Sequence, residues 1–293
     1  MSDRISYAYY PGCSQTGSAI DYDMSTREVM RDLGVELNEV PDWTCCGSSP
    51  AHAIDGALSA ALSARNLEQA RTMGAGRLTT PCPSCLANLR TAARKLRAPL
   101  FKERVDRLLD EPYQGGVTAK STLEVLFAEV GPEKVAARVI LPLTGLKIVP
   151  YYGCLTTRLK EVMQFDSEEN PVSMDALLRA CGAEVPDFSF KTECCGASLA
   201  IPKKDAVVAL SGKIMEMARL AGADAVAVAC PLCQMNLDLR RGQINRAMGT
   251  RNDIPVFYFT QLIGLALGFA PDKLGVGKLC VNPKRVLDRI VRS

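Results

Sequence analysis

Two kinds of hydrophobic pattern alternate along this chain. Short runs of β-branched, aromatic or small apolar residues, such as IVPYY at 148–152 and AVAVA at 225–229, are typical of buried strands. A helix is expected at 202–221, because apolar residues recur there at helical spacing, at Val207, Leu210, Ile214, Met217 and Ala218. Strands that alternate with helices predict right-handed βαβ units and parallel sheets. We therefore expect an α/β protein.

The order of these segments is a tandem repeat. Three stretches of the first half recur in the second: ISYAYYPGC (5–13) as LKIVPYYGC (146–154), DLGVELNEVPDWTCCG (32–47) as ACGAEVPDFSFKTECCG (180–196), and GRLTTPCPSCLANLR (76–90) as DAVAVACPLCQMNLDLR (224–240). The helix at 202–221 has its counterpart at 51–73. We expect two Rossmann-like domains, 1–143 and 144–293, each with a small parallel sheet and related by a pseudo-twofold axis.

Ten of the twelve cysteines follow the repeat. Each half has a single cysteine after a strand, an adjacent pair followed by glycine, and a C-x-x-C pair at the start of a helix. The two sets of five are Cys13, Cys45, Cys46, Cys82 and Cys85, and Cys154, Cys194, Cys195, Cys230 and Cys233. Each of these cysteines would lie at the carboxyl end of a strand or in a loop beside it, where α/β sheets place their ligands.

Five thiols per set narrow the possible chemistry. A structural zinc ion takes four ligands, ordinary iron–sulfur clusters also take four thiolates, and an odd number cannot pair fully as disulfides. An adjacent pair is explained if its sulfurs reach different irons of a larger cluster, so the repeated five favours iron–sulfur over zinc. Gly12, Gly47, Gly153 and Gly196 each adjoin one of these cysteines and would let backbone N–H groups approach the cofactor closely.

Composition limits the remaining functions. The chain has 293 residues, of which 47% are hydrophobic and 23% charged, with a net charge of +3. No dense basic tract indicates a nucleic-acid partner, no segment is apolar enough to predict a transmembrane helix, and the N-terminus has no signal-peptide pattern. We expect a cytoplasmic protein. Its single GVGKL stretch at 275–279 is too partial a glycine motif to predict a flavin or NAD site.

The doubled cysteine pattern resembles the CCG domain of the heterodisulfide reductase B subunit, over essentially the whole chain. The resemblance implies that each set of five holds a noncubane [4Fe–4S] cluster, so that two such clusters face a common cavity where a disulfide is reduced. It further implies an electron-supplying, ferredoxin-like C subunit with cubane [4Fe–4S] clusters, and a flavoprotein A subunit behind it. Relatives with this domain occur in complexes that oxidise other substrates, so the resemblance does not fix the substrate.

Three functions follow as hypotheses. The leading one is a catalytic subunit, with sulfur metabolism as its setting, that interconverts a disulfide and two thiols, and no catalytic side chain is predicted beyond the clusters. The second is an electron-transfer subunit that relays electrons to a quinone or a dehydrogenase. The third is a structural or zinc-binding protein.

Several other residues receive structural expectations. Cys181 aligns with Leu33 and is expected to be a buried free thiol, and Cys280 is given no role. His52, the only histidine, could supply a proton, but a surface position at a helix start is favoured. The tyrosine pairs Tyr9–Tyr10 and Tyr151–Tyr152 are expected to pack or hydrogen-bond around the clusters. Trp43 is expected either to shield a cluster from water or to pack in the core, and both explain it equally well.

Overall fold

The computed structural model describes residues 5–48 and 50–291 and contains two parallel sheets. The first sheet has the order β2-β1-β3-β4 and the second the order β5-β6-β7. The expected α/β class with a small parallel sheet in each half is confirmed. The strands are β1 Ile5–Tyr9, β2 Val35–Glu39, β3 Arg77–Thr80, β4 Thr118–Ser121, β5 Ile148–Tyr151, β6 Ala225–Val228 and β7 Val256–Tyr258.

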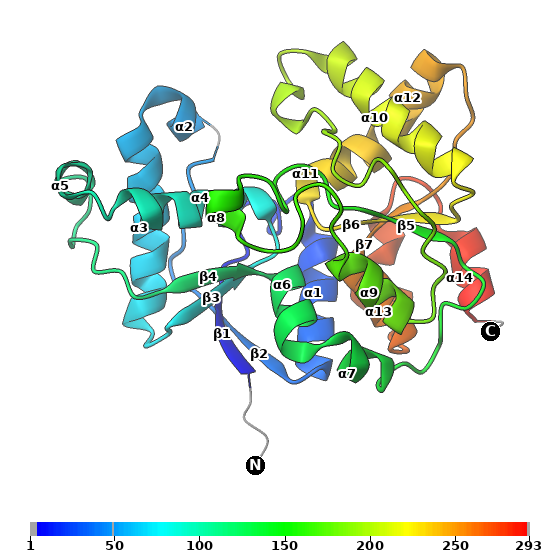
Figure 1. The fold of residues 1–293 in the computed structure, drawn as a ribbon, viewed down its shortest axis with the longest axis horizontal. Helices are drawn as coiled ribbons and strands as arrows, with labels where there is room; N and C mark the ends of the chain where they lie inside the picture. The colour runs from blue at the N-terminus through cyan, green and yellow to red at the C-terminus, as the bar shows by residue number, and fades with distance from the viewer. Residues whose placement is uncertain (1–4, 49, 292–293) are drawn as a thin grey trace.

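Helices follow or connect these strands in both halves (Figure 1). Those of the first half are α1 Ile20–Asp32, α2 Pro50–Ile54, α3 Gly56–Thr72, α4 Pro83–Lys95, α5 Pro99–Asp106, α6 Thr122–Val125 and α7 Pro132–Ala136. Those of the second half are α8 Lys160–Met163, α9 Ser173–Ala180, α10 Lys204–Leu220, α11 Pro231–Gln234, α12 Arg241–Met248, α13 Phe259–Ala266 and α14 Lys284–Ile290. Two π-helical turns, η1 Leu126–Val130 and η3 Met235–Leu239, extend α6 and α11, and short 3-10 turns lie at Ala197–Leu199 (η2), Pro271–Leu274 and Val276–Lys278.

The two sheets correspond strand by strand, with one difference. β5, β6 and β7 pair in the same order as β1, β3 and β4. The counterpart of β2 is reduced to a single parallel bridge between Lys147 and Glu184. Pro186 follows this bridge closely, and proline cannot donate a ladder hydrogen bond, which is consistent with pairing that stops there.

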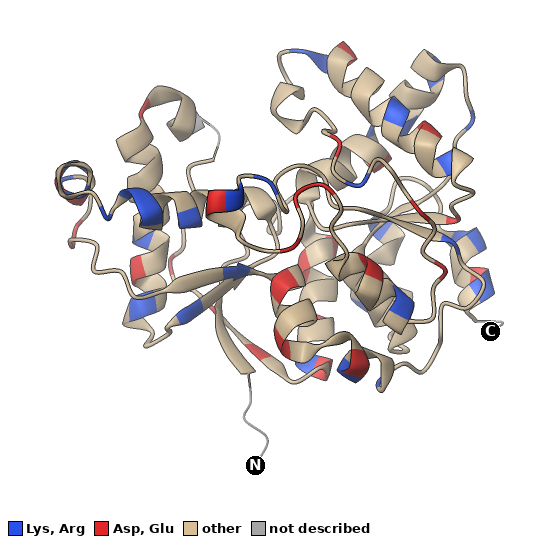
Figure 2. Ribbon diagram, in the orientation of Figure 1, with Lys and Arg blue, Asp and Glu red and all other residues tan. Residues whose placement is uncertain are grey.

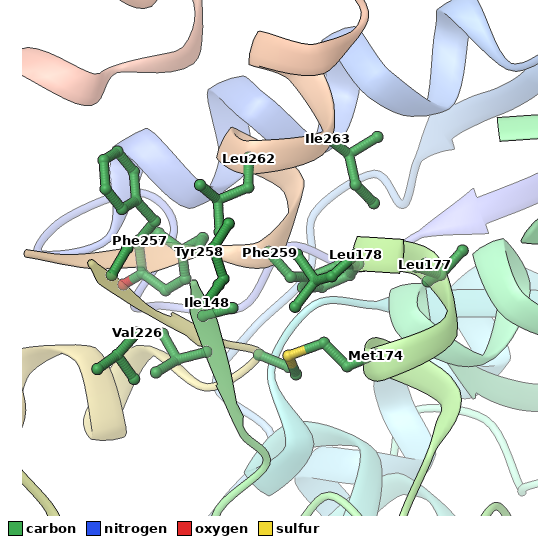
Figure 3. Close-up of a cluster of buried hydrophobic side chains, with 14 of the residues drawn as sticks. Ile148, Met174, Leu177, Leu178, Val226, Phe257, Tyr258, Phe259, Leu262 and Ile263 are labelled. Atoms are coloured by element: carbon green, nitrogen blue, oxygen red, sulfur yellow. The ribbon is translucent and has the colours of Figure 1, made fainter. Parts of the chain in front are cut away.

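One hydrophobic core joins the halves. It contains β5–β7, α9 and α13 of the second half together with the buried face of α1. Figure 3 shows Met174 and Leu178 of α9 in one cluster with Phe259, Leu262 and Ile263. A smaller core beneath α3 and α4 belongs to the first half, except that α8 adds Val162 and Met163 to it. Each half therefore inserts an element into the core of the other.

The interface between the two halves is called the seam below, and the contact between α1 and α13 forms its centre. Tyr22 of α1 stacks on Tyr258, with ring centroids 4.1 Å apart and ring planes within 4° of parallel. The Tyr22 hydroxyl donates a hydrogen bond to the carbonyl oxygen of Ala229 at 3.2 Å, and the hydroxyls of Ser25 and Thr260 lie 2.7 Å apart. All of these groups are buried, so the seam is a polar network inside an apolar core.

The helix expected at 51–73 is wrong as a single element. Asp55 interrupts it in an extended conformation, and its carboxylate accepts hydrogen bonds from the N–H groups of Ala57 and Leu58. This N-cap begins α3 at Gly56 and leaves α2 as a separate short helix. The helix expected at 202–221 is confirmed, but its buried face is centred differently, on Val208, Ser211 and Met215 as well as Val207 and Ile214.

Surface charge and helix length add two observations. Lys and Arg are interleaved with Asp and Glu over both halves (Figure 2). Within the described part of the chain, no helix combines the length and the apolar composition that crossing a bilayer requires.

The seam gives the first prediction. Tyr22→Phe keeps the stacked ring and removes one buried hydrogen bond, which should lower the free energy of unfolding by about 1 kcal/mol. Tyr22→Leu also removes the stack and leaves a cavity, so the loss should be about 3 kcal/mol. Urea denaturation of the two variants measures both values. Equal losses would show that the Tyr22–Tyr258 stack does not stabilise the seam.

Candidate metal centres

The carboxyl ends of the parallel strands bring each set of cysteines together. Cys13 follows β1, and Cys82 follows β3 and is the N-cap of α4, which carries Cys85 in its first turn. Cys154 and Cys230 follow β5 and β6 in the same way, and Cys230 caps α11. The adjacent pairs, Cys45–Cys46 and Cys194–Cys195, lie in the loops that follow β2 and the Lys147–Glu184 bridge.

The same hydrogen bonds hold the adjacent cysteine pair in both halves. In the first half the carbonyl oxygen of Cys46 accepts from Ser63 Oγ at 2.8 Å and from Asn88 Nδ2 at 3.2 Å. In the second half the carbonyl oxygen of Cys195 accepts from Ser211 Oγ at 3.1 Å and from Asn236 Nδ2 at 3.4 Å. A long helix and the C-x-x-C helix thus tie down the same peptide group.

Buried tyrosines hold the residue before each pair. Tyr10 Oη donates to the carbonyl oxygen of Thr44 at 2.7 Å, and Tyr151 Oη donates to that of Glu193 at 2.7 Å. Burial is the main cause that raises the pKa of both phenols, and the charges of the neighbouring cysteines raise it further. Both tyrosine hydroxyls therefore stay protonated and remain donors at neutral pH. The expectation that tyrosines hydrogen-bond around the cysteines is confirmed for these two residues.

The thiols of each set interact with one another. A hydrogen bond from Cys85 lowers the pKa of Cys46 to about 6, and one from Cys233, whose sulfur is 3.7 Å away, lowers the pKa of Cys195 to about 6. Burial, followed by the charges of Cys194, Cys195 and Cys230, raises the pKa of Cys154 to about 12.

Cys13 is related in the same way to its own set. Burial is the main cause that raises the pKa of the Cys13 thiol, and the charges of Cys45, Cys46 and Cys82 raise it further. Cys13 therefore lies near three other cysteines of its own set. As the side chains stand, no three histidine, cysteine or carboxylate groups among the described residues are arranged around a single metal ion.

Burial divides each set into an inner and an outer part. The inner cysteines are buried, and they are Cys46, Cys82 and Cys85 in the first half and Cys195, Cys230 and Cys233 in the second. The outer ones are Cys13 and Cys45, which are exposed, and Cys154 and Cys194, which are half-buried and exposed. Each set therefore has one side embedded in protein and one side open.

Two glycines come into direct contact with the inner sulfurs. A Cβ atom at Gly12 would lie 3.0 Å from Cys85 Sγ, and one at Gly153 would lie 2.8 Å from Cys233 Sγ. Both glycines have positive φ, +77° and +69°. Gly47 and Gly196 act differently, since their N–H groups donate to Cys45 Sγ at 3.4 Å and Cys194 Sγ at 3.3 Å. All four glycines thus shape the thiol sites.

The Tyr22–Tyr258 stack lies within electrostatic reach of one cysteine from each set. Burial is the main cause that raises the pKa of Tyr22. The charges of Cys230 and Cys82, which belong to different sets, also raise it. Tyr258 is fully buried, and burial, Asp21 and the same two cysteines raise its pKa. Its hydroxyl has no hydrogen-bond partner among the described residues. The aromatic stack is therefore near both thiol sites.

A cavity of about 270 Å³ lies beside the first set, between the halves. The first half contributes Ser48, two residues after Cys46, and Ser84, which lies between Cys82 and Cys85. The second half contributes Leu155, which adjoins Cys154, and Leu159. The cavity is therefore lined by residues that lie next to Cys82, Cys85 and Cys154 in the sequence and close to Cys46, and no described cysteine is among its lining residues.

The remaining candidates lie as follows. Cys181 is fully buried, as expected, and burial raises its pKa to about 12. Cys280 is exposed, and its N–H donates to Asp238. His52 is exposed, which agrees with the favoured surface position, and it lines the cavity. Trp43 packs edge-on against Tyr10, with ring centroids 5.7 Å apart.

Four further residues of the site, Asn88, Asn236, Ser63 and Ser211, are not among those predicted from the sequence. A signal was present, because each asparagine is the third residue after the second cysteine of its C-x-x-C pair, within a stretch that matches between the halves. Each serine lies sixteen or seventeen residues beyond the carbonyl that it holds, in the helix that follows the pair. Identity of polar residues between the repeats could have identified all four.

The sites fit an iron–sulfur cluster in three respects. The donors are thiols, the ligands that iron–sulfur clusters require. Glycines replace side chains where a Cβ would collide with a sulfur. Buried polar atoms of Gln15, Thr44, Thr80 and Thr157, each within three residues of a cysteine of the two sets, have no hydrogen-bond partner among the described residues. Such atoms are costly unless something satisfies them.

Comparisons with known proteins agree with this arrangement. The profile of the CCG family, described as a cysteine-rich domain, matches residues 7–90 and 148–238. This defines the chain as a protein with two CCG cysteine-rich domains. The chain belongs to the family of the heterodisulfide reductase B subunit, as its near full-length similarity to proteins of that name also shows.

Three curated relatives illustrate the range of this family. The chain is 33% identical to the 8-methylmenaquinol:fumarate reductase membrane anchor subunit of Wolinella succinogenes, over 96% of this chain and 98% of the relative. It is 31% identical to the B subunit of the ferredoxin/F420H2-dependent CoB-CoM heterodisulfide reductase of Methanosarcina acetivorans, over 96% and 95%. It is 28% identical to a protein of Archaeoglobus profundus described as like the heterodisulfide reductase B subunit, over 99% of each chain.

One solved structure shares the fold. A hypothetical protein from Helicobacter pylori superposes with a TM-score of 0.76 at 13% identity, over 96% of this chain. This chain spans about half of that protein, 53% of its length. At this identity the likeness concerns the fold alone.

The close approach of Gly153 to Cys233 gives the second prediction. Gly222 has the same φ, +69°, but faces open space, so Gly222→Ala should cost only the left-handed backbone strain, about 1 kcal/mol of unfolding free energy. Gly153→Ala should cost about 2 kcal/mol more, because its methyl group collides with the buried sulfur. Denaturant titration of both variants measures the difference. Equal losses would mean that Cys233 moves aside freely.

Proposed function

We propose that this chain is the iron–sulfur subunit of an oxidoreductase that interconverts a disulfide and two thiols. The observation that carries the proposal is the pair of five-thiol sets, each built with the same serine, asparagine and tyrosine ties. The relatives named as B subunits of CoB-CoM heterodisulfide reductases support it, because their names state a disulfide substrate.

The proposed cofactors are two noncubane [4Fe–4S] clusters, one on each set. Five thiolates exceed the four that an ordinary cluster takes. The ligands would be Cys13, Cys45, Cys46, Cys82 and Cys85 for one cluster and Cys154, Cys194, Cys195, Cys230 and Cys233 for the other. When bound, such clusters supply one-electron transfer and iron with affinity for sulfur.

The reaction balances with two electrons. The S–S bond of the disulfide breaks, two electrons and two protons are taken up, and two thiols leave, while the reverse reaction returns both electrons. We propose that a ferredoxin-like subunit with cubane [4Fe–4S] clusters exchanges these electrons, with a flavoprotein subunit behind it. Relatives that are named as reductase subunits support a multisubunit setting.

The chain's own residues position the site and keep it dry. Gly47 and Gly196 donate N–H groups to the outer sulfurs Cys45 and Cys194, which orients these two side chains. Asn236 Nδ2 donates a hydrogen bond to Cys195 Sγ, one of the inner sulfurs, at 3.5 Å. Tyr10 and Tyr151 are fully buried and exclude water from the protein side, so only the outer face is left for a substrate.

A second candidate function is electron relay without a disulfide substrate. The observation that favours it is the similarity to a fumarate reductase subunit, whose name states a quinol and fumarate rather than a disulfide. In that case the two sets would pass electrons between a quinone or dehydrogenase partner and the rest of a complex. The same ligands serve both functions, so the substrate must be tested directly.

Cofactor content gives the third prediction. Anaerobically purified protein should contain about eight irons and as much acid-labile sulfide per chain, which is about four of each per set. Cys46→Ser and Cys195→Ser should each lower both values by about half and abolish disulfide reduction. The matched controls, Cys181→Ala and Cys280→Ser, remove thiols outside the two sets and should keep full content. Zinc without sulfide would contradict the proposal.

A paramagnetic resonance experiment gives the fourth prediction and separates the two candidate functions. Loaded protein is oxidised with and without a simple thiol such as 2-mercaptoethanol. Disulfide chemistry predicts a new signal that depends on the thiol, because the thiol then binds at a cluster. If full cofactor content is present and the thiol changes nothing, the relay function is favoured and the disulfide function is rejected.

A further inference from the structure

The hydrogen bonds around the two adjacent cysteine pairs differ at one inner sulfur. Asn236 Nδ2 donates to Cys195 Sγ at 3.5 Å, in addition to the Cys195 carbonyl oxygen at 3.4 Å. Among the described residues, Asn88 Nδ2 in the first half donates only to the carbonyl oxygen of Cys46. Asn236 is buried, whereas Asn88 is half-buried and lines the cavity beside the first set. A hydrogen bond from asparagine to an inner sulfur is therefore particular to the second set.

A guanidinium group stands behind this asparagine. Arg240 Nε donates to Asn236 Oδ1 at 3.2 Å, and Arg240 Nη2 donates to the carbonyl oxygen of Ala200 at 3.0 Å. A positive donor on the oxygen of an amide polarises it, so that its N–H becomes a stronger donor to the sulfur. In the first half the hydrogen bond to the equivalent sulfur, that of Cys46, comes from Ser48, which is neutral.

The outer side of the second set also has a cation beside it. The N–H of Arg158 donates to the carbonyl oxygen of Cys154 at 3.0 Å, and Arg158 Nη2 donates to Thr192 Oγ1 at 3.1 Å. Glu169 lies 3.8 Å from this guanidinium, but its side chain is 83% exposed, so water screens the pair. Residues 14–17, which follow Cys13, include no charged residue. The turn after the single cysteine is thus cationic only in the second half.

The other charges near the sets do not cancel this difference. Three further ion pairs have a member close in sequence to one of the cysteines, and they are Arg65–Asp42, Arg90–Glu124 and Lys191–Asp175. Two backbone N–H groups donate to the carboxylate of Asp238, and Glu193 is exposed to water. Lys95 lies ten residues beyond Cys85 on α4, which is about 15 Å along the helix.

A redox site responds to such a difference. Each one-electron reduction adds one negative charge, and a nearby cation or a hydrogen bond to a ligand sulfur stabilises that charge. Both raise the reduction potential of the site. Since Asn236 is buried, the effect of Arg240 passes to Cys195 through a region of low dielectric constant, where it is weakly screened.

We propose that Arg240, acting through Asn236, gives the second set a higher reduction potential than the first. The second set then takes up the first electron from the ferredoxin-like subunit, which is oxidised by one electron as the set is reduced by one. Arg240 is a positioning residue in this scheme. The inference rests on the cofactors of the proposed function, holds for disulfide chemistry and for electron relay, and adds the order of electron uptake.

Proteins loaded at one set only test the order directly. Cys46→Ser should retain the cofactor of the second set, and Cys195→Ser that of the first. Each is titrated with dithionite and redox mediators under anaerobic conditions, and reduction is followed by visible absorption and paramagnetic resonance. We expect the higher midpoint potential in the Cys46→Ser protein. If either variant fails to fold, the fully loaded chain is titrated instead, and its higher midpoint is compared between variants.

Arg240→Gln tests the residue. In the Cys46→Ser protein it should lower the equilibrium constant for reduction at least tenfold, which is 59 mV for one electron. In the Cys195→Ser protein it should change nothing. Arg240→Lys keeps the positive charge and should restore most of the potential, although the bond to Ala200 is altered in both variants. Arg219→Gln removes a cation that is paired with Glu216 on the surface, and should leave both potentials unchanged.

The outcomes separate this inference from the function on which it rests. If the unaltered protein binds no iron and sulfide, the proposed function is overturned and this inference with it. The inference alone is overturned if the protein is fully loaded and the first set has the higher potential. It is also overturned if Arg240→Gln leaves the potential of the second set unchanged, or if Arg240→Gln and Arg240→Lys lower it equally.

Discussion

The whole structure depends on one constraint, which is that three separate stretches of each half must bring their cysteines to the same edge of a sheet. A parallel sheet satisfies it, because the chain leaves every strand at the same edge. Cys13 follows β1 and Cys82 follows β3, and the pair Cys45–Cys46 reaches the same edge through the loop after β2. That loop has no regular hydrogen bonding of its own, so Ser63 and Asn88 anchor it through one carbonyl. The second half repeats this solution although its counterpart of β2 is a single bridge, which shows that the anchors, rather than the length of that strand, fix the cysteine pair.

The repeat keeps what holds the sulfurs and changes what surrounds them. The glycine, serine, asparagine and tyrosine contacts recur with nearly the same distances in both halves. The outward face of the C-x-x-C helix does not recur, since α4 is a continuous α-helix over Pro83–Lys95, whereas α11 ends at Gln234 and is extended by the π-helical turn η3. Packing on that face is not required to assemble the thiols, and it is therefore free to diverge.

The sequence predicts those features that depend on pattern within one half. Buried parallel strands are apolar on both faces, so AVAVA and IVPYY are recognisable as strands, and the duplication itself indicates that the ten cysteines lie at strand ends or in the loops and helix starts beside them. The break at Asp55 was not predicted because, within a helical pattern, an aspartate that caps a helix cannot be distinguished by sequence from an ordinary exposed residue. The shifted face of α10 escapes it because Ser211 is buried by its bond to Cys195, a long-range contact that hydrophobicity does not encode. The Tyr22–Tyr258 stack joins residues 236 positions apart, so no local sequence pattern predicts it. The domain boundary at 143/144 and the ligand roles of the cysteines stay predictions.

Packing at the seam fixes the position of the two thiol sites relative to each other. Tyr22 belongs to the first half, yet its hydroxyl bonds to Ala229, the residue before Cys230 of the second set. In the other direction, α8 of the second half places Val162 and Met163 in the core beneath α4, and Arg90 of α4 donates to the carbonyl oxygen of Met163. A shift of one half against the other would break buried hydrogen bonds and open both cores, each at a cost of several kcal/mol. The separation between the two sets is therefore fixed by the same packing that stabilises the fold.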